Sequence, residues 1–237
     1  MNSNQVALVT GANKGIGLEI ARQLGKQGIT VVLGARDAAK GQAAADILKN
    51  EGIDAHTVKL EVTDADDVAA LPAFFADTFG RLDILVNNAG IFPDPSGPIT
   101  LEMFREGYEA NVFAPYALTE TLLPLLLAAP AGRIVNHSSL LGSLTTIASA
   151  QTPNEYLFFV YNSSKAALNM VTVVHAEKHK DTALKINAAH PGSVKTDMNQ
   201  SGELTVEQGA LTAVRLATLP ADGPTGGFFH MDDTLPW

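Results

Sequence analysis

The chain has 237 residues, 46% of them hydrophobic and 17% charged, which is typical of a globular protein built around one wide sheet. Its net charge of −9 argues against a nucleic-acid partner, because phosphate binding needs a clustered excess of lysine and arginine. The absence of cysteine excludes disulfides and thiolate sites, and with an N-terminus unlike a secretory signal it favours a cytoplasmic location.

Apolar runs rich in β-branched residues alternate with stretches of helical periodicity. Strands are expected at residues 6–10, 30–35, 55–60, 82–87, 133–137 and 185–189, with a last one within 226–231. Helices are expected at residues 15–27, 37–51, 64–79, 101–127 and 160–180. This alternation predicts an α/β fold, a doubly wound, Rossmann-like parallel sheet, as a single domain over residues 1–237. Ligands of such sheets bind at the carboxyl ends of the strands.

The most apolar run, residues 118–129, is shorter than the roughly 20 residues that span a bilayer and contains Pro124. We therefore expect a buried helix end at this run and no membrane association.

A glycine-rich turn follows the first strand and opens the first helix, with the sequence Thr10-Gly11-Ala12-Asn13-Lys14-Gly15-Ile16-Gly17. Glycines allow a tight turn and let backbone amides approach a pyrophosphate at the positive end of a helix. A plain turn is the alternative, but the position between strand and helix favours nucleotide binding.

The end of the second strand indicates which nucleotide is preferred. An acidic residue there binds the ribose 2′-hydroxyl of NAD, whereas a basic one favours the 2′-phosphate of NADP. Here Ala35 takes the acidic position and Arg36 follows, and Lys14 supplies a second charge. The alternative is that Arg36 is an ordinary surface residue, and the acidic Asp37 is adjacent to it. The pattern nevertheless favours NADP(H), because a guanidinium forms charge-assisted hydrogen bonds with phosphate.

Tyr161 and Lys165 lie four residues apart in a predicted helix and so share one face. A nearby ammonium favours the phenolate, so this pair is suited to proton transfer, although the same spacing is common on ordinary helix surfaces. Ser138 and Ser139 follow a predicted strand and offer hydroxyls to a carbonyl oxygen, or simply form a turn.

These motifs together resemble the short-chain dehydrogenase/reductase family, in its compact, carbonyl-reductase-like form. The resemblance covers nearly the whole chain in order: Thr10-Gly11-x-x-x-Gly15-x-Gly17, Asn87-Asn88-Ala89-Gly90, Asn111, Ser139-x-x-Gly142, Tyr161-x-x-x-Lys165 and Pro191-Gly192. It implies a reductase that transfers a hydride between NADP(H) and a ketone or aldehyde.

The resemblance also implies roles for the matching residues. Tyr161 would be the general acid and base, Lys165 would lower its pKa and bind the nicotinamide ribose, and Ser139 rather than Ser138 would hold the substrate oxygen. Asn111 would support a water relay from Lys165. The implied cofactor contacts are Gly11, Asn13, Lys14, Gly15, Ile16, Gly17, Arg36, Glu61, Val62, Asn88, Ala89, Gly90, Tyr161, Lys165, Pro191, Gly192, Val194 and Thr196.

Two departures from the family pattern concern the cofactor and the substrate. Glu61-Val62 replaces an aspartate–valine pair, which puts the adenine contact in doubt. The spacing from Ser139 to Tyr161 is several residues longer than in compact members and adds Tyr156, a competing tyrosine nine residues before Lys165. Apolar residues that could line a substrate pocket, or simply pack the core, are Phe92, Leu140, Leu141, Phe158, Phe159, Met198 and Trp237.

Other interpretations carry less support. His175 and His179 share a helix face but lack a third ligand, so we expect a solvated face and no metal site. A non-catalytic NADP(H)-binding regulatory protein is the main alternative, and the intact set of Asn111, Ser139, Tyr161 and Lys165 argues against it. We expect a small apolar carbonyl or alcohol as substrate, and a homo-oligomer, dimer or tetramer, although carbonyl-reductase-like members include monomers.

Overall fold

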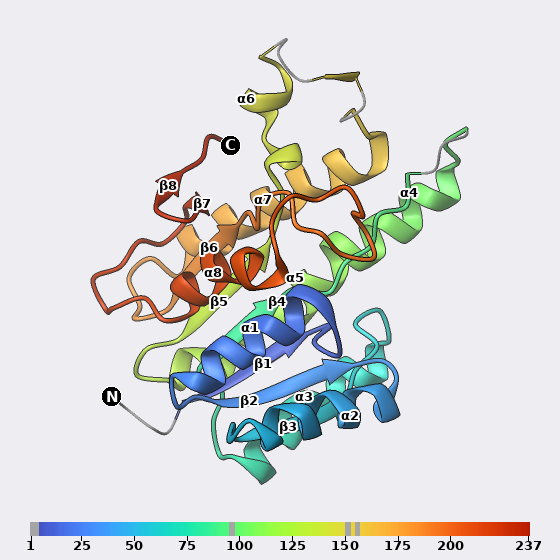
Figure 1. The fold of residues 1–237 in the computed structure, drawn as a ribbon. Coiled ribbons are helices and arrows are strands. Elements are labelled where there is room, and N and C mark those ends of the chain that lie inside the picture. Colours follow the sequence, from blue (N-terminus) through green and yellow to red (C-terminus); the bar gives the residue numbers. More distant parts are fainter. Residues whose placement is uncertain (1–4, 95–97, 150–152, 155–156) are drawn as a thin grey trace.

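The computed structural model describes residues 5–94, 98–149, 153–154 and 157–237 (Figure 1). Within these residues eight strands form one sheet in the order β3-β2-β1-β4-β5-β6-β7-β8. The strands are β1 (Val6–Thr10), β2 (Thr30–Ala35), β3 (Ala55–Lys59), β4 (Ile84–Asn87), β5 (Arg133–His137), β6 (Lys185–Ala189), β7 (Phe228–His230) and β8 (Asp233–Thr234). Strands β1 to β7 pair in parallel and β8 pairs antiparallel with β7. The predicted doubly wound α/β fold is confirmed.

Helices cover both faces of the sheet. Long helices are α1 (Gly15–Lys26), α2 (Ala38–Asn50), α3 (Ala65–Thr78), α5 (Ala114–Ala128), α7 (Phe159–Lys178) and α8 (Val206–Ala217). Shorter ones are α4 (Leu101–Tyr108), the π-helical turn η1 (Glu109–Phe113), the 3₁₀ turn η2 (Leu140–Gly142) and α6 (Leu144–Ile147). Buried residues of α1, α2 and α8 join one core cluster, and those of α3, α5 and α7 join a second.

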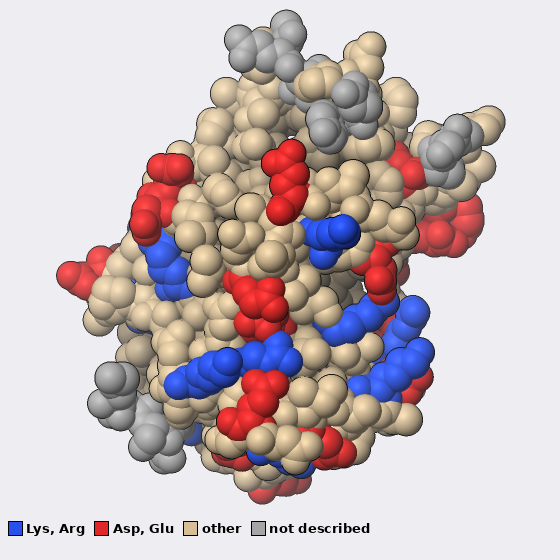
Figure 2. Space-filling view, in the orientation of Figure 1, with Lys and Arg blue, Asp and Glu red and all other residues tan. Residues whose placement is uncertain are grey.

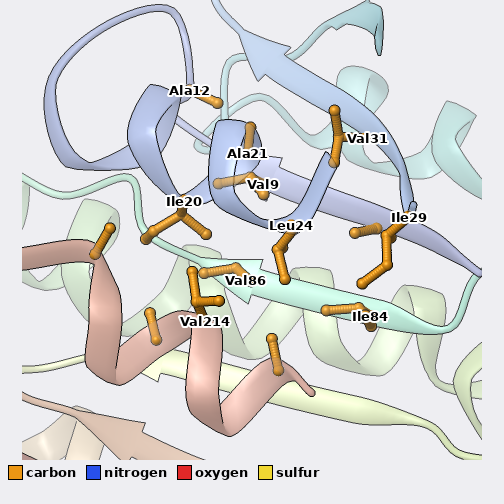
Figure 3. Close-up of a cluster of buried hydrophobic side chains, with 14 of the residues drawn as sticks. Val9, Ala12, Ile20, Ala21, Leu24, Ile29, Val31, Ile84, Val86 and Val214 are labelled. Atoms are coloured by element: carbon orange, nitrogen blue, oxygen red, sulfur yellow. The ribbon is translucent and has the colours of Figure 1, made fainter. Parts of the chain in front are cut away.

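The alternating direction of side chains along each strand explains why the core has two clusters. Ala7 and Val9 of β1 belong to the first cluster, whereas Val6 and Leu8 belong to the second. Successive side chains of a strand point to opposite faces of the sheet. Figure 3 shows the first cluster, where side chains of α1 and Val214 of α8 pack over β1 and β4.

The structure corrects three element predictions. The helix expected at residues 101–127 is divided into α4, η1 and α5. Helix α8 was not expected, although the capping box that Thr205 and Gln208 form is a recognised sequence signal for a helix start. The short antiparallel β8 was also missed, because two residues carry too little pattern.

One helical stretch, Leu101–Ala128, is long and apolar enough to cross a membrane by length and composition, but half of its apolar window is buried inside the fold. Leu118, Leu122 and Leu126 of α5 are part of the second core cluster, as the expected buried helix end requires. A core helix of this kind passes the same length test.

Acidic and basic side chains are interspersed over the middle and lower parts of the face seen in Figure 2. The upper part of this face, toward α6, is mostly uncharged.

Candidate active site

The glycine-rich turn lies between β1 and α1, at the point where the winding of the sheet reverses. Gly11 has φ +62°, a conformation that side-chain-bearing residues rarely adopt. A Cβ on Gly17 would lie 2.5 Å from Nδ2 of Asn88 and 2.6 Å from the carbonyl oxygen of Gly11. Helix α1 has no side-chain cap and no acidic residue in its first turn. Its N-terminal amides are therefore placed to receive an anion.

The residues expected at the adenosine end follow β2 and β3. The turn is bonded to β2 by the amide of Ala12, which donates to the carbonyl of Gly34 at 3.2 Å. Arg36 is exposed beside this contact, directly after β2. Glu61 and Val62 lie just beyond β3, and Val62 packs against the second core cluster.

Lys14 is exposed and its Nζ lies 2.5 Å from Oδ2 of Asp197. This bond lowers the pKa of Asp197. The contact brings the loop after β6 against the glycine-rich turn, although the two are far apart in sequence.

The end of β4 is tied to the same turn. The hydroxyl of Thr10 accepts from the amides of Asn88 (3.0 Å) and Ala89 (2.9 Å), and Nδ2 of Asn88 donates to the carbonyl of Thr10 at 2.8 Å. A Cβ on Gly90 would lie 3.0 Å from Oδ1 of Asn111 and 3.6 Å from Nζ of Lys165. Asn88, Ala89 and Gly90 therefore connect the glycine-rich turn to the residues expected to carry out the chemistry.

The two serines after β5 point to different partners. The hydroxyl of Ser138 donates to Oδ1 of Asn169 at 2.6 Å and is buried. The hydroxyl of Ser139 accepts from the amide of Leu141 at 3.2 Å and acts on the phenol of Tyr161, whose pKa it lowers. The geometry thus places Ser139, and not Ser138, at the tyrosine.

Tyr161 and Lys165 lie one turn apart on α7, with Nζ of Lys165 5.7 Å from the centre of the tyrosine ring. Tyr161 is half-buried, whereas only 5% of Lys165 is exposed. The ammonium donates to the main-chain carbonyl of His137 at 2.8 Å. The carboxyl end of β5 therefore orients the lysine toward the tyrosine.

Burial shifts both groups toward their neutral forms. It raises the pKa of Tyr161 to about 12, an effect that the hydrogen bond with Ser139 opposes. It lowers the pKa of Lys165 to about 8. In this structure desolvation of the phenol outweighs the lowering by Ser139, and the role of Lys165 in lowering the pKa of Tyr161 stays a prediction.

Asn111 lies in the middle of the π turn η1 and is fully buried. Its Oδ1 accepts from the amide of Ile91 at 2.9 Å, and its Nδ2 donates to the carbonyl of Ile91 and to Oγ of Ser164. The side chain thus connects the segment after β4 to α7 close to Lys165.

The segment after β6 is the fourth part of the site. Pro191 and Gly192 are half-buried, Val194 packs against Gly209 of α8, and the amide of Thr196 closes a turn with Asn199. Before them, Nδ1 of His190 accepts from the amide of Leu140, the residue that follows Ser139. Burial lowers the pKa of His190 to about 4, so the ring is neutral at pH 7.

The apolar residues suggested for a pocket separate into groups. The rings of Phe92 and Phe158 are 4.8 Å apart, and Phe92 lies 5.1 Å from the ring of Tyr161. Phe159 and Met198 are exposed, and Trp237 stacks on Phe228. Phe92 is thus the member of that set that packs against Tyr161, and Phe158 packs against Phe92.

His175 corrects one prediction. It is 3% exposed, stacks on Tyr116 and is 2.9 Å from Oε1 of Glu120, so it joins α7 to α5 rather than facing solvent. Among the described residues there is no group of three or more potential metal ligands. Tyr156 lies outside the described residues.

Sequence reasoning missed Asp94 and Ser164. Oδ1 of Asp94 accepts from the amide of Val160 and Oδ2 from that of Tyr161, and Ser164 donates to the carbonyl of Tyr161. Asp94 belongs to no local motif, because it acts on residues 66 and 67 positions away. Ser164 occupies one of the unspecified positions of Tyr161-x-x-x-Lys165.

Comparison with known proteins identifies the family of the chain. The profile of the short chain dehydrogenase family matches residues 5–206. The chain belongs to this family of oxidoreductases. It is 36% identical to a (+)-neomenthol dehydrogenase of Arabidopsis thaliana, over 94% of this chain and 95% of that protein. It is 35% identical to carbonyl reductase (NADPH) 3 of Homo sapiens, over 99% of each chain.

Solved structures of related proteins share the fold of this chain. An NADPH-bound carbonyl reductase from chicken fatty liver superposes with a TM-score of 0.84 at 30% identity, over 99% of each chain. Salutaridine reductase from Papaver somniferum gives a TM-score of 0.82 at 33% identity, over 97% of this chain and 100% of that one. The alignment with the human carbonyl reductase spans 275 positions, more than the 237 residues here, so that relative has segments with no counterpart in this chain.

Proposed function

We propose that this protein is an NADPH-dependent reductase that converts a ketone or aldehyde to an alcohol, reversibly, at Tyr161. The observation that carries the proposal is the meeting of three groups at one edge of the sheet. The hydroxyl of Ser139 acts on the phenol of Tyr161 and lowers its pKa, and the ammonium of Lys165 lies 5.7 Å from the centre of the tyrosine ring.

The cofactor is NADP(H). The uncapped amides of α1 fit a pyrophosphate, and the glycines that border them leave room for backbone contact. Arg36 is exposed at the end of β2, where a guanidinium binds the 2′-phosphate as a charge-assisted pair. When bound, the reduced nicotinamide supplies the hydride, and the protein supplies orientation and proton transfer.

The chain's own residues would divide the rest of the reaction. Ser139 donates a hydrogen bond to the substrate oxygen, which places the carbonyl beside Tyr161. Tyr161 is protonated at pH 7 because its pKa is about 12, so it is ready to give its proton to the oxygen as the carbon is reduced. Lys165 then stabilises the phenolate, and Asn111 supports the route by which the proton is replaced.

The substrate is proposed to be a small apolar carbonyl compound, because the ring of Phe92 lies 5.1 Å from that of Tyr161 and the ring of Phe158 packs against Phe92. Large apolar side chains are exposed on two helices that contact each other: Tyr116 on α5, and Met170 and Val174 on α7. Exposed apolar side chains of this kind favour a homo-oligomer.

Cofactor oxidation by the purified protein tests the proposed function. We expect NADPH to be oxidised, in preference to NADH, with at least one compound in a panel of aryl ketones, aldehydes, diketones and cyclic terpenoid ketones. Tight NADPH binding without turnover across the panel would favour the regulatory alternative. Absence of NADPH binding would contradict the cofactor assignment.

A further inference from the structure

Helix α7, which bears Tyr161, begins without a cap of its own. Phe158 occupies the N-cap position and makes no side-chain hydrogen bond. The free amides of the first turn are instead bonded by Asp94, from the segment after β4. Its Oδ1 accepts from Val160 at 3.0 Å and its Oδ2 accepts from Tyr161 at 2.7 Å.

The other end of that segment is tied to the same helix. Asn111 bonds both the amide and the carbonyl of Ile91, and its Nδ2 donates to Oγ of Ser164 at 3.1 Å. Ser164 in turn donates to the carbonyl of Tyr161 at 2.8 Å. Both main-chain polar groups of Tyr161 are therefore connected to residues 91–94, one through Asp94 and the other through Ser164 and Asn111.

Packing holds the segment against α7. The ring of Phe92, between the two tied ends, lies 5.1 Å from the ring of Tyr161. On α4, a Cβ at Gly107 would lie 2.4 Å from Cγ1 of Val160 and 3.0 Å from Cγ of Pro93. The absence of a side chain at Gly107 thus lets α4 close over the contact between Pro93 and the first turn of α7.

We propose that Asp94 is a positioning residue for Tyr161, an inference that rests on the proposed function. Its carboxylate caps α7 from a distant segment and fixes the first turn, where an uncapped helix frays. The negative charge also complements the positive end of the helix. A fixed first turn keeps the phenol within reach of Ser139, and a displacement of about 1 Å in a reacting group can cost roughly 100-fold in rate.

The test compares Asp94→Ala with a matched cap variant, Asp64→Ala. Asp64 also accepts two backbone amides at a helix N-terminus, those of Asp66 and Asp67 on α3, but that helix bears none of the proposed catalytic residues. Both variants should lose similar stability. We expect Asp94→Ala to lower kcat at least about tenfold, with the Kd for NADPH within about twofold of wild type. Asp64→Ala should keep kcat within about twofold.

A conservative variant, Asp94→Asn, distinguishes an effect on the position of Tyr161 from an effect on the stability of the protein. Asp94→Asn keeps one acceptor oxygen for two amides, so its kcat should lie between those of wild type and Asp94→Ala. Amide hydrogen exchange of residues 159–164 should accelerate in Asp94→Ala and stay unchanged in Asp64→Ala.

The outcomes distinguish the two proposals. If wild-type protein does not turn over any carbonyl compound, the proposed function fails, and the exchange measurement still decides whether Asp94 holds the first turn. If wild type is active and Asp94→Ala keeps its kcat, or if both variants lose kcat equally, the positioning role of Asp94 is refuted.

Discussion

Only 5% of Lys165 is exposed, and its ammonium donates a hydrogen bond to the carbonyl of His137 at 2.8 Å. Tyr161 keeps its proton in the same surroundings. Burial favours the neutral forms of both Tyr161 and Lys165. Such a pair is suited to a reaction that briefly creates a phenolate beside an ammonium. The charges then stabilise each other where little water screens them.

The pH dependence of carbonyl reduction should report Lys165. Its pKa of about 8 means that the ammonium is present below that pH and is lost above it. Because reduction leaves a phenolate on Tyr161, kcat should fall as the pH rises through about 8. The Lys165→Met variant should be slow at every pH, and its kcat should not fall as the pH rises through about 8. A fall in kcat at the same pH in Lys165→Met would show that another group causes the pH dependence.

Arg36 is the residue expected to separate NADPH from NADH. Loss of a charge-assisted bond costs about 1.5–3 kcal/mol, so Arg36→Ala should weaken NADPH binding roughly tenfold to 100-fold and leave NADH nearly unchanged. Titration with each nucleotide measures this. Arg105→Ala removes the same charge from α4 and should affect neither nucleotide. Equal weakening of both nucleotides by Arg36→Ala would refute the phosphate contact.

At the scale of elements, the start of each helix indicates its role. The side chains of Asp37, Asp64, Thr100, Ser143 and Thr205 cap α2, α3, α4, α6 and α8. Helix α5 continues directly from η1 and has no such cap, and α1 and α7, which begin after loops, also have none. Helix α1 leaves its amides toward the proposed phosphate site, and α7 receives Asp94.

Close contact between α1 and the glycine-rich turn depends on Gly17. A Cβ there would lie 2.6 Å from the carbonyl oxygen of Gly11, so Gly17→Ala should displace α1 from the turn and weaken NADPH binding about tenfold, with a loss of about 1–3 kcal/mol in stability. Gly25→Ala is the control on the same helix, where the Cβ would meet Cγ2 of Ile53 at 2.1 Å. It should destabilise the fold without changing the Kd for NADPH. Similar nucleotide affinity in both variants would contradict this account.

Some elements were predictable from sequence and others were not. Buried strands with apolar runs, such as β1 and β5, were placed correctly because both of their faces are covered. The π turn at Asn111 was not predicted, since helical periodicity continues on either side of it. The capping of α7 by Asp94 was not predictable either, because no local pattern records a bond between such distant residues.

At the scale of the molecule, the order of the strands gathers the site. Strand order reverses between β1 and β4, and the residues after β1, β4, β5 and β6 meet at one edge of the sheet. The sequence predicted this because carboxyl ends of parallel strands share an edge. It did not predict the packing of Phe92 against Phe158 and Tyr161, because these rings come from segments far apart in the chain.

The central claim is that Tyr161 transfers the proton in carbonyl reduction. The most direct measurement is kcat for NADPH-dependent reduction by Tyr161→Phe beside wild type, with the Kd for NADPH measured on the same samples. The substitution removes only the hydroxyl, so we expect nearly all turnover to be lost while NADPH affinity stays close to that of wild type. Substantial turnover by Tyr161→Phe would contradict the assignment of Tyr161 as the proton donor.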